Sequence, residues 1–181
     1  MREVAWASVL AAVVIGSKGA NMKMHAVLAA LLLCGCMQRT VPVYGDTGDT
    51  DSARYREAGT ASIIGQGLMR EQGGGVVTCA GSTALLLPDL PPTHQGLNAM
   101  YSGYDPNWSG EKWANGRRST TCDTQGNFEF NQLPAANWYV LVTVVWEVAG
   151  VSQRGTLAAP AATQAGQQLR VLLTDANLIA Q

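Results

Sequence analysis

Four cysteines carry the most distinctive chemistry of this 181-residue chain, and their spacing divides them into two pairs. Cys34 and Cys36 are separated by one glycine behind an apolar stretch, whereas Cys79 and Cys122 stand far apart further along the chain. A thiol can accept a lipid, form a disulfide or bind a metal ion as the thiolate. Each pair is therefore a candidate for a different reaction, and the surrounding residues decide between them.

The segment around the first pair resembles the processing site of bacterial lipoproteins. An apolar run, Ala26–Leu33, follows Lys23 and leads directly into Leu33-Cys34-Gly35-Cys36. In such a lipobox an apolar residue stands at −3, a small residue stands at −1, and the next cysteine accepts the lipid. The resemblance implies cleavage before Cys36 and lipidation of its thiol. Cys34 as the acceptor would have Leu33 at −1, which is too large.

The leader leaves several alternatives open. If translation begins at Met22 or Met24, residues 1–21 are an upstream extension and residues 22–35 form a helical signal peptide; otherwise the leader starts at Met1. An ordinary cleaved signal or an N-terminal anchor is the competing interpretation, although its apolar stretches are short for a membrane span. Met37, rather than Asp, follows Cys36, which in the enterobacterial sorting rule permits transfer to the outer membrane. We therefore expect a lipid-anchored protein of the cell envelope, at the outer membrane and facing the periplasm.

Export also determines the chemistry expected of the second pair. Two cysteines that remain in an oxidising compartment most often form a disulfide, so Cys79 and Cys122 are predicted to pair. Two free, buried thiols are the alternative. A metal site is disfavoured because two isolated cysteines and His94, the one histidine beyond the leader, do not have the spacing of zinc ligands. The sequence predicts neither a metal nor a cofactor.

Catalytic and nucleic-acid-binding patterns are not recognisable in the sequence. His94 could act as a general base, but a solvent-exposed loop histidine is the favoured interpretation, and no nucleophile with a local partner accompanies it. Gly73-Gly74-Gly75 indicates a turn, because the lysine and helix of a phosphate-binding loop do not follow it. The chain has 12 basic and 13 acidic residues with no basic stripe. We therefore predict a protein that is not an enzyme and has no nucleic-acid partner.

Aromatic residues cluster in one segment and form the most suggestive candidate site. Tyr101, Tyr104, Trp108 and Trp113 lie among polar residues such as Asp105. Rings with polar neighbours could stack on sugars or form a protein contact. The alternative, which the sequence favours, is that these rings fold back over the core as a lid.

Short strands joined by turns must position these residues. The longest strand signal, Trp138–Val148, is apolar on both faces, as is typical of a strand covered on both sides. Residues 36–58 are polar and predict a flexible tether, and residues 89–116 predict a long irregular loop with a helical turn near Leu97–Tyr101. Residues 176–181 predict a polar tail. The other predicted strands are Thr60–Met69, Val76–Cys79, Thr83–Leu87, Arg117–Cys122, Asn127–Phe130, Ser152–Leu157 and Gln168–Leu173.

A recognisable pattern lies between Thr121 and Val140 and consists of Thr121, Asp123, Gly126, Phe128, Phe130, Leu133, Pro134 and Val140. With these residues the stretch resembles carboxypeptidase-regulatory-like domains, which have a transthyretin-like fold. Ala136 stands where the family has Gly, and Trp138 where it has Tyr. The resemblance covers about residues 59–174 and includes Cys79-Ala80-Gly81. It implies a Greek-key β-sandwich of about seven strands over residues 59–175.

These patterns favour a non-enzymatic envelope lipoprotein whose β-sandwich is an interaction or scaffolding module at the membrane surface. Its partners would be the membrane, through the lipid, and another envelope protein. The alternative is a carbohydrate- or peptidoglycan-binding module that uses the segment 101–113. An accessory subunit of an envelope enzyme is a weaker alternative.

Overall fold

The computed structural model describes residues 40–41, 49–71, 74–106, 108 and 116–181. Cys36, the rest of the leader, most of the predicted tether before Asp49, and Trp113 lie outside the described residues. Neither helix within these ranges is long and apolar enough to span a membrane.

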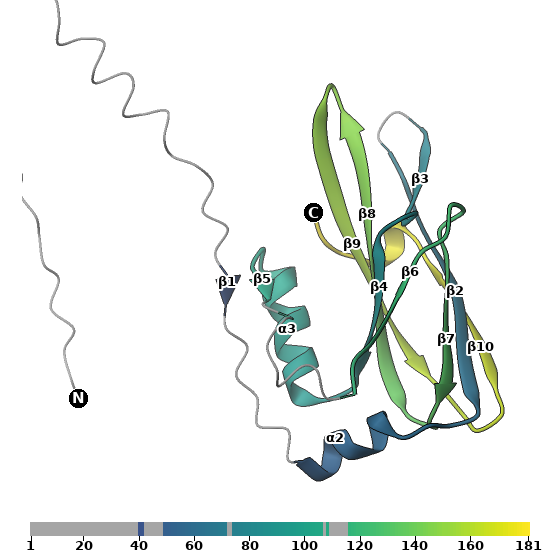
Figure 1. Ribbon diagram of the computed structural model, residues 1–181. Helices are drawn as coiled ribbons and strands as arrows, with labels where there is room; N and C mark the ends of the chain where they lie inside the picture. The colour runs from purple at the N-terminus through teal and green to yellow at the C-terminus, as the bar shows by residue number, and fades with distance from the viewer. Residues whose placement is uncertain (1–39, 42–48, 72–73, 107, 109–115) are drawn as a thin grey trace, which may run out of the picture. The chain divides into compact units, whose positions relative to one another are not determined.

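Two β-sheets form a sandwich, which confirms the predicted all-β fold (Figure 1). The five-stranded sheet has the order β11-β9-β8-β4-β6, with antiparallel neighbours. In the four-stranded sheet, β2 pairs in parallel with β10 and in antiparallel fashion with β7 and β3. A short parallel pair, β1–β5, forms separately. The strands are β1 Thr40–Val41, β2 Ala61–Arg70, β3 Val76–Thr78, β4 Thr83–Pro88, β5 Asp105–Pro106, β6 Arg118–Thr121, β7 Asn127–Leu133, β8 Asn137–Val148, β9 Val151–Ala162, β10 Gln168–Leu173 and β11 Leu178–Ala180.

The main core lies between the sheets and follows from the alternation of side chains along each strand. Phe128 and Phe130 of β7 are both buried, with their ring centroids 5.9 Å apart, as the shared face of the Phe-x-Phe pattern predicts. Trp138 begins the inner face of β8 and is fully buried. Its indole N–H donates to the hydroxyl oxygen of Thr163 at 3.1 Å. The tryptophan therefore has a buried polar partner at the position where the resembled family has tyrosine.

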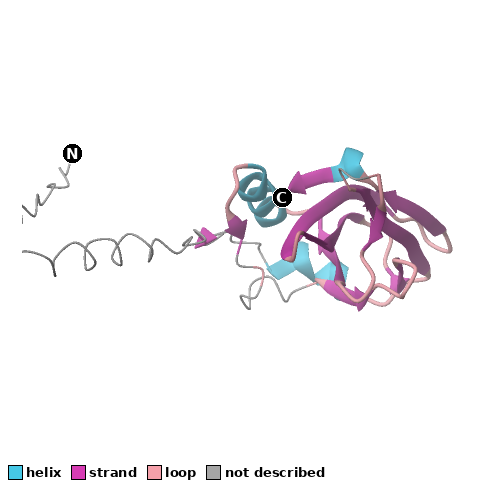
Figure 2. Ribbon diagram, turned by 90° about the horizontal axis from the view of Figure 1, so that it is seen from above, coloured by secondary structure: helices cyan, strands magenta, loops and turns pink. Residues whose placement is uncertain are grey.

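A helix covers the outer face of the first half of β8, so this part of the strand is enclosed on both sides as its pattern predicts, whereas Val145 and Val148 further along are exposed. This helix, α3, spans Pro91–Tyr101, where the sequence predicted an irregular loop with one helical turn. Proline at its first positions is compatible with a helix start, because those N–H groups have no intrahelical acceptor. A second, smaller core lies beneath it and consists of Leu87, Leu97, Met100, Leu141 and Ile179. Figure 2 shows α3 on the outside of the strands.

The predicted flexible tether does not extend through residues 49–58. Residues Asp49–Arg56 form helix α2, and the Tyr55 side chain enters the main core. The segment is polar overall and has no apolar periodicity from which to expect a packed helix. The Tyr55 ring holds it against the sandwich, together with hydrogen bonds from the Arg118 guanidinium to the carbonyl oxygens of Tyr55 and Glu57.

The C-terminal segment also differs from the prediction. Residues Leu178–Ala180 form β11, which pairs with β9 at the edge of the five-stranded sheet, and Ile179 is buried. A short 3-10 helix, η2, over Asp175–Asn177 precedes this strand. The last residues are therefore part of the fold rather than a polar tail.

The turns around β7 show which residues have a left-handed backbone conformation. Ala136, in place of glycine, is not among the residues with positive φ; these include Gln132 (55°) and Gly126 (79°) instead. Gly126 lies in the predicted turn before β7, where Asp123 accepts hydrogen bonds from the side-chain and backbone N–H groups of Asn127. These hydrogen bonds hold the pKa of Asp123 below its usual range.

The predicted disulfide between Cys79 and Cys122 is confirmed. The two Cα atoms are 5.8 Å apart, and both residues are buried. Cys79 follows β3 of the four-stranded sheet, and Cys122 follows β6 of the five-stranded sheet. The bond therefore connects the two layers of the sandwich.

Candidate functional site

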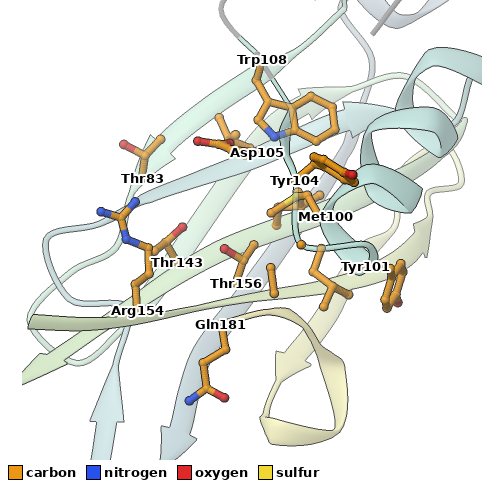
Figure 3. A pocket seen from close by; sticks show the side chains of 15 residues that line it. Thr83, Met100, Tyr101, Tyr104, Asp105, Trp108, Thr143, Arg154, Thr156 and Gln181 are labelled. Carbon is orange, nitrogen blue, oxygen red and sulfur yellow. The ribbon is translucent and has the colours of Figure 1, made fainter. Parts of the chain in front are cut away.

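A groove with a volume of about 590 Å³ lies on the outer face of the five-stranded sheet, at the C-terminal end of α3 (Figure 3). Strands β4, β8 and β9 form its floor, and the end of α3 with the following segment to residue 108 forms one wall. The chain end after β11 completes it. Three elements far apart in the sequence thus contribute to one surface.

The wall contains three of the four aromatic residues that the sequence singled out. Tyr101 ends α3 and is 66% exposed, whereas Tyr104 and Trp108 are half-buried. The Trp108 indole packs against α3 at Gly96, where any side chain would collide with the ring. The structure thus combines both expectations: Trp108 covers the smaller core, as a lid would, and all three rings line the groove.

The floor is polar where it is open to solvent. Thr83, Thr143 and Thr156 lie on neighbouring strands, and their side chains follow one another along the groove (Figure 3). Hydroxyl groups both donate and accept hydrogen bonds. Arg154 extends from β9 on the same face, and Asp105 lies at the opposite wall. The groove therefore offers hydroxyls, a guanidinium and a carboxylate beside aromatic rings.

Sequence reasoning missed the threonines and Arg154. Each is an ordinary residue on a predicted strand, and only the strand pairing brings them together. Thr143 stands at an outward-facing position of β8 where the neighbouring outward positions carry larger apolar residues. This polar interruption is the signal that could have indicated them.

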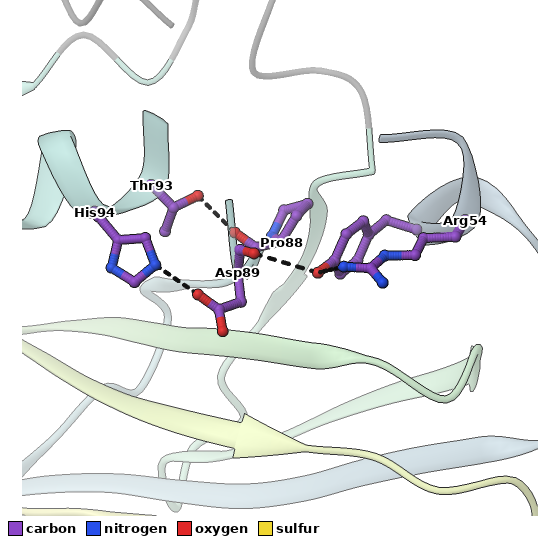
Figure 4. Close-up of polar contacts among 6 residues, drawn as sticks. Arg54, Pro88, Asp89, Thr93 and His94 are labelled. Carbon is purple, nitrogen blue, oxygen red and sulfur yellow. Dashed lines mark hydrogen bonds and ion pairs between the residues drawn. The ribbon is translucent and has the colours of Figure 1, made fainter. Parts of the chain in front are cut away.

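His94 is exposed, as predicted, but lies in α3 rather than in a loop. Its Nε2 atom is 2.6 Å from a carboxylate oxygen of Asp89 (Figure 4). The ring also meets Tyr139 edge-to-face, with the centroids 5.4 Å apart. Burial, the carboxylate of Asp89 and the nearby Tyr101 raise the pKa of Tyr139 above its usual range. These contacts fix the first turns of α3 on the sheet.

A smaller hollow of about 180 Å³ lies on the other side of Tyr101 and includes His94 and Tyr139. Within the described ranges, no group of three His, Cys, Asp or Glu side chains is arranged to hold a metal ion.

Comparison with known proteins indicates the fold alone. No model of a known protein family matches the chain, and no curated protein is significantly similar to it in sequence. The crystal structure of a candidate carbohydrate-binding protein from Pseudomonas aeruginosa is similar, with a TM-score of 0.60 and 20% identity. The match covers 72% of this chain and 98% of that one. The two proteins share a β-rich fold.

A second solved structure, the major pilin subunit BcpA of Bacillus cereus, matches with a TM-score of 0.37 and 10% identity, over 64% of this chain and 30% of that one. This likeness is too low to carry an argument.

Proposed function

We propose that this chain is a non-enzymatic envelope lipoprotein whose β-sandwich binds a saccharide in the groove at the end of α3. The observation that carries the proposal is the arrangement of Tyr101, Tyr104 and Trp108 beside a floor of threonine hydroxyls. A sugar ring has an apolar face, formed by its C–H groups, and a polar rim of hydroxyls. Aromatic rings beside a set of hydroxyls suit these two surfaces.

The similar Pseudomonas protein supports this proposal by analogy, since its name describes a candidate carbohydrate-binding protein on the same kind of fold. A shared fold does not transfer a function, so the argument depends on the groove.

Tyr104→Ala and Trp108→Ala are each expected to weaken saccharide binding by about tenfold or more, the effect of losing one stacked ring of roughly 1.5 kcal/mol. A glycan array of linear hexose, hexosamine and uronic acid polymers identifies the ligand, and titration calorimetry then compares the variants.

Leu172→Ala is the matched control, because Leu172 is a large, exposed side chain (58%) on β10 of the other sheet. The affinity of the Leu172→Ala variant for the saccharide should equal that of the wild type. Melting temperatures of all variants are compared, because Trp108 also contacts α3. Absence of binding to every glycan on the array would exclude the saccharide proposal.

An interaction or scaffolding role is the second candidate, and exposed valines favour it. Val145, Val148 and Val151 in the β8–β9 hairpin are 49%, 52% and 59% exposed. Such apolar side chains near a strand end suit contact with another protein.

The lipid anchor is proposed from the lipobox alone. Cys36→Ala is expected to move the protein from the detergent phase to the aqueous phase in phase partitioning and to abolish labelling with palmitate. Cys34→Ala is the matched control and should partition like the wild type. If Cys36→Ala still partitions into detergent and is labelled, Cys36 is not the anchor.

A further inference from the structure

Threonine occupies the same level of four neighbouring strands on the outer face of the five-stranded sheet. Thr121 of β6 pairs with Thr83 of β4, and Thr143 of β8 pairs with Thr156 of β9. The antiparallel register of β4 and β8 places Thr83 opposite Thr143. The result is a continuous row across the strands, in the order Thr121, Thr83, Thr143, Thr156; we call it the threonine row.

The threonine row is longer than the groove. Neighbouring strands lie about 4.8 Å apart, so the four side chains span roughly 14 Å. Thr83, Thr143 and Thr156 line the groove, whereas Thr121 lies beyond it, is exposed, and borders a separate hollow formed mainly by β2, β7 and β10. At the other end, Ala180 of β11 pairs with Thr156 and also lines the groove. A ligand placed along the row would therefore lie across the strands and extend past the aromatic wall.

We infer that the ligand is an extended, linear oligosaccharide that lies along the threonine row, with a sugar ring beyond the groove reaching Thr121. This inference rests on the proposed function and specifies its ligand. The spacing of the hydroxyls is close to the length of one ring in an extended 1,4-linked chain. Each hydroxyl can donate or accept, so a repeating ligand can place one sugar over each threonine. The rings at Tyr101 and Tyr104 hold one end of the chain by stacking.

Sheet stability alone is the competing explanation of the threonine row. Threonine is favoured in strands, and paired threonines stabilise neighbouring strands. That explanation predicts no effect of Thr121 on binding. Because Thr121 lies outside the groove, its contribution to ligand affinity distinguishes the two explanations.

The experiment measures binding of two probe series, β-1,4-linked N-acetylglucosamine and β-1,4-linked glucose, each from one to six rings, to the full-length protein. Affinity is expected to rise at least tenfold between one and four rings and then to level off. Thr121→Val should weaken tetramer binding about three- to tenfold, the effect of one hydrogen bond, and leave binding of the single ring unchanged. Thr124→Val is the matched control, because Thr124 is an exposed threonine in the adjacent turn, outside the row. It should bind every probe like the wild type.

The outcomes separate this inference from the proposed function. Binding that is equally tight for one ring and six rings, with no effect of Thr121→Val, would overturn the extended ligand and leave the saccharide site intact. Equal losses in Thr121→Val and Thr124→Val would assign the effect to the edge of the sheet and would also overturn it. No binding of either series, together with no retention on the glycan array, would exclude both the extended ligand and the saccharide site.

Discussion

Tyr55→Ala is expected to lower the free energy of unfolding by about 3–5 kcal/mol, the range for removing a large aromatic side chain from a core. The Tyr55 side chain is 0% exposed, and its ring meets Trp138 edge-to-face with the centroids 4.8 Å apart. Its hydroxyl donates to the carbonyl oxygen of Asp89 and accepts from the guanidinium of Arg54. Alanine would leave a cavity that the paired strands cannot close. Urea-induced unfolding, followed by circular dichroism, measures the change.

Tyr55→Phe is the matched control, because it keeps the ring and removes the hydroxyl. A loss of about 1 kcal/mol is expected, the usual effect of a lost hydrogen bond. If Tyr55→Ala unfolds at the same urea concentration as the wild type, α2 is not part of the folded domain. The predicted tether would then extend to residue 58 after all.

The disulfide gives the second large effect. Its loss is expected to lower the free energy of unfolding by about 4 kcal/mol, because the bond closes a loop between residues 43 apart and restricts the unfolded chain. Both cysteines are buried between the sheets, so we expect the folded structure to change little when the disulfide is removed. Urea unfolding of the wild type with and without dithiothreitol measures the effect.

The Cys79→Ala/Cys122→Ala double variant is the control for the reductant. It should unfold at the same urea concentration with and without dithiothreitol, and close to the reduced wild type. An unchanged unfolding midpoint of the wild type after full reduction, verified by alkylation of both thiols, would contradict the prediction.

The periodicity of the sequence predicted most of the strands, because each strand buries the side chains of one face and so alternates apolar with other residues. The pattern of Trp138–Val148 even indicated cover on both faces, although not which element supplies it. The helix α3 escaped prediction because its buried positions include Thr93 and Gly96, which an apolar pattern does not count. Glycine is required at position 96 because the Trp108 ring packs against it. This contact joins two separate segments and cannot be recognised from the sequence.

The candidate site was predictable only in part for the same reason. Tyr101, Tyr104 and Trp108 stand out in the sequence because aromatic residues cluster in this segment. The threonine row depends on the register of four strands, which no single strand encodes. Helix α2 likewise depends on one ring, Tyr55, that inserts into a core formed by residues far along the chain.

The parallel pairing of β2 with β10 has a consequence for how this protein matures. The first strand of the sandwich takes its partner from near the end of the chain, and the two segments are also joined by a hydrogen bond between residues 106 apart, Thr60 and Gly166. Such a high contact order makes closure of the fold a late event. During synthesis β2 therefore stays without this neighbour until the segment Gln168–Leu173 has left the ribosome. A chain that has not yet folded at that time is in the state that a translocation channel accepts, in keeping with the export that we propose.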